Sequence, residues 1–115
     1  MRITLTTTGR RSGKPRPVTI YAWEDGDDLV VVGSWGGARN DPSWVANLRA
    51  EPRATVRHGK NEYAVRAREV RGRTRDRLWR LVVDRFPLYE RYQRRTERVI
   101  PLFVLESDAV PPDKA

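Results

Sequence analysis

The segment from Thr8 to Arg16 combines the residue types that bind anions. It reads TGRRSGKPR, so three arginines, one lysine and a serine hydroxyl surround two glycines. Glycines permit a tight turn whose backbone N–H groups point at one ligand, and guanidinium groups bind phosphate or carboxylate oxygens in pairs. The segment is not a P-loop, because only three residues separate Gly9 from Gly13 and Lys14 is followed by Pro15. We expect an anion site here, with a solvated basic hairpin loop as the alternative.

Two further segments carry groups that suit a flat ligand. Gly36 and Gly37 follow an apolar run, and glycines beside a strand end let a planar ring approach the backbone. A flexible connection would have the same sequence. Trp44 and Asn47 lie three residues apart and share one face of an expected helix, although Trp44 taken alone is more typical of a core residue.

An aromatic group follows in the last third of the chain. Phe86, Tyr89 and Tyr92 recur every three residues and so form one wall of a helical segment. We expect Phe86 in the core. Tyrosine hydroxyls need a polar or solvent partner, which favours the rim of a pocket for the other two.

The common catalytic sets are missing from this sequence. It has no cysteine and a single histidine, His58, which we interpret as an ordinary strand side chain. No Ser/His/acid arrangement and no pair of acids around a pocket can be placed, and no metal site is expected. If the protein is an enzyme, a bound cofactor must therefore supply the chemistry.

The composition describes a small basic protein. Its 115 residues predict one domain, and 23 basic against 15 acidic residues give a net charge of +8. Such a charge attracts anions, which leaves nucleic acid, a membrane surface or an acidic small molecule as candidate partners. No apolar run is long enough to span a membrane or to form a signal peptide, so we expect a cytoplasmic protein without a transmembrane segment.

Alternation and turn signals predict mostly β structure. We expect strands at 4–8, 16–23, 29–33, 54–58, 62–70 and 100–105, and helices starting at 41–42, 74 and 87. Asp41 and Thr74 are the expected helix N-caps. Short connections favour antiparallel pairing, so the prediction is an α+β, mostly β fold: a six-stranded antiparallel barrel with flanking helices. The domain should span residues 1–106, followed by a disordered tail, 107–115.

The sequence resembles the deazaflavin-dependent nitroreductases of mycobacteria and other actinobacteria, which use coenzyme F420 (8-hydroxy-5-deazaflavin). The resemblance covers about Leu5 to Glu106. Its matching pieces are Leu5–Arg16, Gly36–Ala38, Asp41–Trp44 with Asn47 and Leu48, Tyr89, Tyr92 and Arg98–Pro101. Their order and spacing are more specific than any single motif. The resemblance implies a split β-barrel of the flavin-binding type.

The resemblance also implies roles for individual residues. The loop Gly9–Arg16 would hold the phosphate and the acidic polyglutamate tail of the coenzyme. The implied coenzyme contacts are Gly9, Arg10, Arg11, Ser12, Arg16, Thr19, Ile20, Ser34, Trp35, Gly36, Gly37, Trp44 and Asn47. The implied catalytic residues are Tyr21, Ser34, Tyr89 and Tyr92, with Phe86 in the same substrate pocket. Trp35 replaces a lysine of some relatives, so stacking would replace one contact.

The implied activity is hydride transfer from reduced F420 to an electron-poor acceptor, namely a quinone, an activated alkene or a nitro compound. Tyr89, Tyr92 or Ser34 would hydrogen-bond the acceptor oxygen. The implied partners are thus an acidic coenzyme and a small electrophile, with no nucleic acid. The residues alone leave two alternatives, a non-catalytic deazaflavin or flavin binder and a basic nucleic-acid-binding module. FMN fits less well because it has no polyanionic tail for the arginines, and no residue fixes the oligomeric state.

Overall fold

Six strands and three α-helices are present in residues 1–107, the part of the chain that this computed structural model describes. The strands are β1 (Arg2–Thr8), β2 (Pro15–Asp25), β3 (Asp28–Val32), β4 (Arg53–His58), β5 (Asn61–Glu69) and β6 (Leu102–Ser107). The helices are α1 (Ser43–Ala50), α2 (Gly72–Arg85) and α3 (Leu88–Arg94), with a 3₁₀ turn, η1 (Trp35–Gly37). The predicted elements are all present, and their boundaries differ from the prediction by a residue or two.

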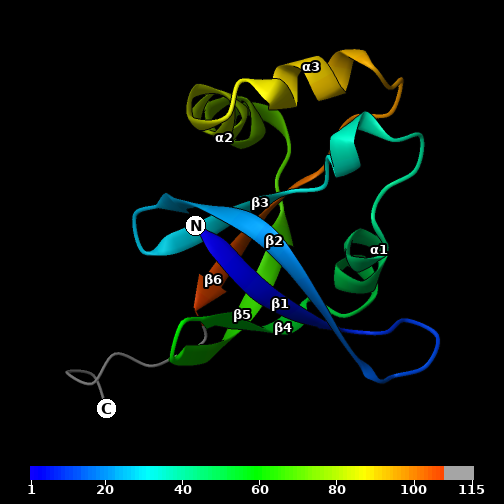
Figure 1. Cartoon of the computed structure of the whole chain (residues 1–115), viewed down its shortest axis with the longest axis vertical. Coiled ribbons are helices and arrows are strands. Elements are labelled where there is room, and N and C mark those ends of the chain that lie inside the picture. The colour runs from blue at the N-terminus through cyan, green and yellow to red at the C-terminus, as the bar shows by residue number, and fades with distance from the viewer. Residues whose placement is uncertain (108–115) are drawn as a thin grey trace.

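The strands close into one barrel in the order β1-β2-β3-β6-β5-β4 (Figure 1). Every pairing is antiparallel, and β1 pairs with β4 to close the barrel, with Leu5 opposite Val56. After β3 the order runs in reverse, because β6, β5 and β4 follow it around the barrel, and β6 therefore lies between β3 and β5. The predicted six-stranded antiparallel barrel with flanking helices is confirmed.

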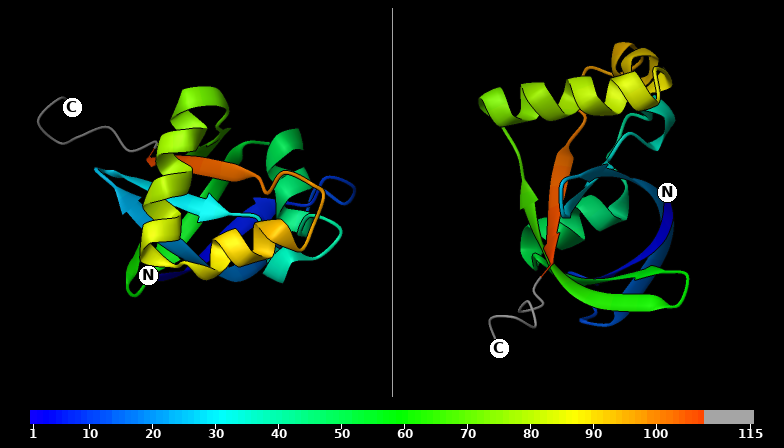
Figure 2. Two further views of the ribbon diagram at one scale, coloured as in Figure 1. Left: turned by 90° about the horizontal axis from the view of Figure 1, so that it is seen from above. Right: turned by 90° about the vertical axis from the view of Figure 1, so that its left-hand side faces the viewer.

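Strand β3 is buried on both of its faces, which explains its continuous apolar sequence. Val31 belongs to the core inside the barrel, together with Leu5. Val30 points outward and packs in a second cluster with Leu78 and Val82 of α2. Figure 2 shows α2 lying across the barrel on the side of β3 and β6, with α3 continuing along the same end. The two clusters thus fix α2 and α3 on the outside of the barrel.

The predicted N-cap at Asp41 is wrong. Helix α1 begins at Ser43 and no side chain caps it. The Asp41 carboxylate instead binds the guanidinium groups of Arg98 at 2.6 Å and Arg49 at 3.4 Å. Two cations attract a carboxylate more strongly than the N–H groups of one helix turn.

The predicted N-cap at Thr74 is also wrong, because α2 begins two residues earlier, at Gly72. At the other end of the fold, Ser107 is the last residue of β6 rather than the first of a tail. The prediction of disorder for the following residues, 108–115, lies outside the described residues.

None of the helices within residues 1–107 has the length and apolar character needed to cross a membrane. The expected cytoplasmic location stays a prediction.

Candidate functional site

A groove of about 840 Å³ runs along one side of the barrel. Its walls come from the end of β1, the β1–β2 loop, β2, the segment after β3, α1 and α3. The volume is in the range of sites for small molecules and cofactors. The groove thus joins segments from both halves of the chain.

The groove brings together most of the residues that the sequence analysis singled out. The predicted site residues that line it are Gly9, Arg10, Arg11, Ser12, Arg16, Thr19, Ile20, Tyr21, Ser34, Trp35, Trp44, Asn47, Tyr89 and Tyr92. Phe86, which we expected in the core, is only half-buried and lines the groove as well, whereas Tyr89, which we expected at the rim, is buried. Their functional roles stay predictions, but their proximity is a property of the fold.

Gly36 and Gly37, in contrast, are not among the lining residues. Gly37 has a φ of +79°, and a Cβ atom there would lie 2.6 Å from the backbone oxygen of Tyr92. The missing side chain lets α3 pack directly against η1. The geometry thus gives Gly37 a packing role.

The β1–β2 loop places cationic groups without internal partners at one end of the groove. Among residues 1–107, the side chains of Arg11 and Lys14 make no hydrogen bond or ion pair, and Arg16 makes only a long bond of 3.4 Å to the Ser12 hydroxyl. Backbone bonds between Gly9 and Lys14 and between Gly13 and Gly9, both 2.8 Å, close the turn. The loop is therefore ordered by its backbone, and its charged groups remain available.

Arg10 and Asn47 connect this loop to helix α1. The side-chain oxygen Oδ1 of Asn47 accepts hydrogen bonds from the backbone N–H of Arg10 (3.2 Å) and from its Nη1 (2.9 Å). The Asn47 amide nitrogen donates to the Thr7 hydroxyl at 3.1 Å. Asn47 and Thr7 are both buried. Asn47 thus fastens the loop to the barrel.

Sequence reasoning missed Thr7 as a lining residue. Thr7 alternates with the buried Ile3 and Leu5 and therefore points into the barrel. That alternation was the signal that could have identified it. Val18, Val32 and Ser43 also line the groove without having been predicted to do so.

The opposite end of the groove is aromatic. Tyr89 is buried, and its ring lies 4.8 Å from that of Phe86 and 6.4 Å from that of Tyr92. The indole N–H of Trp23 donates a hydrogen bond of 2.9 Å to the Tyr89 hydroxyl. Burial raises the pKa of Tyr89 above its ordinary value of 10.0, so the phenol keeps its proton at neutral pH.

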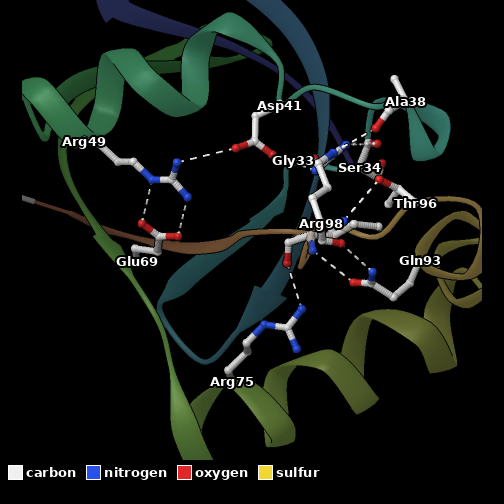
Figure 3. Close-up of polar contacts among 11 residues, drawn as sticks. Gly33, Ser34, Ala38, Asp41, Arg49, Glu69, Arg75, Gln93, Thr96 and Arg98 are labelled. Carbon is white, nitrogen blue, oxygen red and sulfur yellow. Dashed lines mark hydrogen bonds and ion pairs between the residues drawn. The ribbon is translucent and has the colours of Figure 1, made fainter.

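Arg98 holds the segment between β3 and α1 in place (Figure 3). Its guanidinium group donates to four oxygens of this segment, those of Ala38 (2.8 Å), Gly33 (3.0 Å), Ser34 (2.7 Å) and the Asp41 carboxylate (2.6 Å). The side chain is only 14% exposed. Arg98 does not line the groove. It does set the position of Ser34, which lines the groove.

Trp35, the next residue in this segment, has an unusual backbone conformation. Its φ is +42°, in the left-handed region that costs a non-glycine residue about 1–2 kcal/mol. The side chain is 63% exposed and lines the groove. Bonds from the Gly37 and Ala38 N–H groups back to Ser34 and Trp35 maintain the turn. The surrounding contacts therefore hold an exposed indole over the groove.

The groove contains no group of residues that suggests a metal. Residues 1–107 hold no cluster of three His, Cys, Asp or Glu side chains that could bind a metal ion. His58 is exposed at the end of β4 and does not line the groove.

Comparisons with known proteins point to one family. The family model for F420H(2)-dependent quinone reductase matches residues 1–107. The F420H(2)-dependent quinone reductase Rv1261c of Mycobacterium tuberculosis (strain ATCC 25618 / H37Rv) is 36% identical over 104 residues, which cover 88% of this chain and 70% of that protein.

Two solved structures share the fold closely. The structure of the F420-H2 dependent reductase FDR-A has a TM-score of 0.83 and 38% identity, and the match covers 91% of this chain and 93% of FDR-A. A structure described as a domain-swapped dimer has a TM-score of 0.84 and 38% identity, with 91% of this chain and 79% of its own covered.

Proposed function

The chain belongs to the F420H(2)-dependent quinone reductase family, and from this premise we propose that it transfers a hydride from reduced F420 to a quinone bound in the groove. The observation that carries the proposal is the arrangement of one groove, which has arginines with few or no partners within residues 1–107 at one end and tyrosine hydroxyls at the other. An acidic coenzyme suits the first end, and an acceptor oxygen suits the second.

The β1–β2 loop fits the anionic part of the coenzyme. A Cβ atom at Gly9 would lie 2.6 Å from the Ser12 hydroxyl and 3.2 Å from Nε of Arg16, so glycine keeps this cradle open. Arg11, Ser12 and Arg16 would bind phosphate and carboxylate oxygens, and Arg10 would contribute the donors that Asn47 leaves available.

The remaining lining residues would hold the ring and the acceptor together. When bound, the reduced deazaflavin supplies the hydride. Trp44 and Ile20 offer apolar surface that excludes water, and Trp35 offers an indole for stacking. Gathering both reactants in one groove lowers the entropic cost of their encounter.

Four residues with hydroxyl groups would bind the acceptor. Ser34, Tyr21, Tyr89 and Tyr92 all line the groove and can donate to an acceptor oxygen. A hydrogen bond to that oxygen stabilises the negative charge that develops on it during reduction. The same donors suit the oxygens of a nitro group, so a nitro compound is the acceptor to compare with a quinone.

The proposal is tested first by binding and then by turnover. The purified chain is titrated with oxidised F420, with FMN and a short single-stranded DNA as parallel ligands at two salt concentrations. We expect tight binding of F420 alone, followed by oxidation of reduced F420 when a water-soluble naphthoquinone is added. Tight binding without turnover of a quinone or nitro acceptor would indicate a coenzyme carrier. Binding of DNA alone, weakened steeply by salt, would assign the arginines to nucleic acid.

A further inference from the structure

The hydrogen bond between Trp23 and Tyr89 has a fixed direction. The indole nitrogen of Trp23 lies 2.9 Å from the Tyr89 hydroxyl oxygen, and an indole N–H can only donate. The Tyr89 oxygen is therefore the acceptor, and the hydroxyl proton of Tyr89 is not used in this bond.

No other group within residues 1–107 accepts that proton. Tyr89 makes no second hydrogen bond in this part of the chain, although its side chain is buried and borders the groove. A phenol O–H that accepts on one side donates on the other. Tyr89 lines the groove, so a molecule bound there is the candidate acceptor for this proton.

We propose that Trp23 is a positioning residue, which by donating to Tyr89 directs the hydroxyl proton of Tyr89 toward the acceptor oxygen in the groove. The inference rests on the proposed function. It extends that function by identifying Tyr89 as the tyrosine whose hydroxyl acts as a fixed hydrogen-bond donor. The resulting hydrogen bond stabilises charge on the acceptor oxygen and requires no transfer of the Tyr89 proton.

The other groove tyrosines lack such an orienting group. Among the described residues, the hydroxyls of Tyr21 and Tyr92 have no hydrogen-bond partner, so each rotates freely and can accept as well as donate. Trp23 also packs on Phe86, with ring centroids 6.4 Å apart, and meets Tyr89 edge to face at 6.2 Å. These contacts hold the indole in the one orientation that serves Tyr89.

The test removes the N–H group and keeps an aromatic ring, with Trp23→Phe. For quinone reduction we expect kcat to fall about tenfold, as for loss of one hydrogen bond of ordinary strength, and KM to change less than about twofold. Trp79→Phe is the matched control. Like Trp23, Trp79 packs against the second cluster, outside the barrel, but its indole makes no hydrogen bond within residues 1–107. If kcat fell as much in Trp79→Phe as in Trp23→Phe, the inference would be overturned.

A second readout needs neither coenzyme nor turnover. The bond from Trp23 stabilises the Tyr89 phenolate, so it lowers the pKa that burial raises. Trp23→Phe should therefore raise the pKa of Tyr89, measured by tyrosinate absorbance and assigned by comparison with Tyr89→Phe. An unchanged pKa would overturn the inference even if the wild-type chain proved to reduce no quinone, an outcome that would separately contradict the proposed function.

A double-mutant cycle separates orientation from packing. In the Tyr89→Phe background, Trp23→Phe should cause no further loss of kcat, because Trp23 acts through the Tyr89 hydroxyl. Equal losses in both backgrounds would contradict the inference. If Trp23→Phe does not fold, hydrogen exchange of the Trp23 indole N–H still gives an answer: it should be protected in wild type and faster in Tyr89→Phe, and equal rates would contradict it.

Discussion

The two sides of the groove use arginine in opposite ways. On one side, Arg98 is nearly buried and gives its hydrogen bonds to the chain's own oxygens. On the other, Arg11 and Arg16 are exposed and have almost no internal partner among the described residues. The residue type and its charge are the same in both places. What distinguishes an arginine that builds the site from one that is available to a ligand is the list of oxygens it already binds.

The largest effect is expected for Arg98→Met, which removes the guanidinium group and keeps the aliphatic part of the side chain. This variant tests whether Arg98 is structural. It would remove one donor from each of three carbonyls and from the Asp41 carboxylate, so we expect a loss of about 3 kcal/mol in the free energy of unfolding, measured by urea denaturation. Arg98→Lys should recover only part of it, because one ammonium group cannot reach all these oxygens. A loss below about 1 kcal/mol would mean that Arg98 is not a structural residue.

The opposite result is expected for Arg11→Ala combined with Arg16→Ala. Stability should change by less than about 0.5 kcal/mol, since these side chains contribute little to the fold. The Kd for F420 should rise about 30-fold, or about 2 kcal/mol, because two charged contacts with the coenzyme are lost and solvent screens each of them. Arg73→Ala with Arg80→Ala, on the exposed face of α2, is the control of equal charge. Equal affinity in the two double variants would refute the tail site.

Asn47 contributes both to the stability of the fold and to the position of the cationic loop. Asn47→Ala leaves the Arg10 N–H and the Thr7 hydroxyl without their partner, so we expect about 1–2 kcal/mol less stability. The affinity for F420 should also fall several-fold, because the loop that carries Arg11 loses its two hydrogen bonds to Asn47 of α1. Thr7→Val removes only the bond between Thr7 and Asn47, so it should cause smaller losses of stability and affinity. Denaturation and a binding titration on the same samples would show whether the two losses occur together.

The smallest expected effect comes from Glu69, which binds Arg49 through two hydrogen bonds of 2.8 and 2.9 Å. Hydrogen bonding to Arg49 lowers the pKa of Glu69 from its ordinary value of 4.5. The bond therefore stabilises the fold above that value and is lost as the pH falls through the lowered pKa. Glu69→Gln should cost less than about 1 kcal/mol at neutral pH, because Arg49 is half exposed.

Denaturation at several pH values measures this contribution. The difference in stability between wild type and Glu69→Gln should begin to shrink as the pH falls below 4.5 and should disappear below the lowered pKa of Glu69. A difference that persisted in acid would assign the effect to packing. Glu106→Gln, at a more exposed ion pair with Arg68, should cost less at neutral pH.

The features predicted correctly from sequence are those that depend on neighbours along the chain. Alternation and turn residues predicted the barrel strands, and the uninterrupted apolar run at 29–33 predicted β3 among them. Residue types alone also suggested the anion loop, whose anion binding stays a prediction. Each of these signals is local, and the packing of the fold agrees with it.

The features that sequence reasoning missed depend on partners far along the chain. Arg98 binds Gly33 across 65 positions, and Trp23 binds Tyr89 across 66. Asp41 had the right type and place for an N-cap, but a distant guanidinium competes successfully for its carboxylate. No local pattern contains these pairings, so only the folded chain reveals them.

The place of β6 between β3 and β5 has a consequence for how the chain folds during synthesis. The ribosome makes the other five strands first, and until β6 emerges the nascent sheet keeps two unpaired edges, those of β3 and β5. Such edges are templates for pairing with other chains. The apolar residues of β6, among them Phe103 and Leu105, then fill the gap and complete the interior. Among the described strands, the one translated last is thus the one that pairs both of these edges.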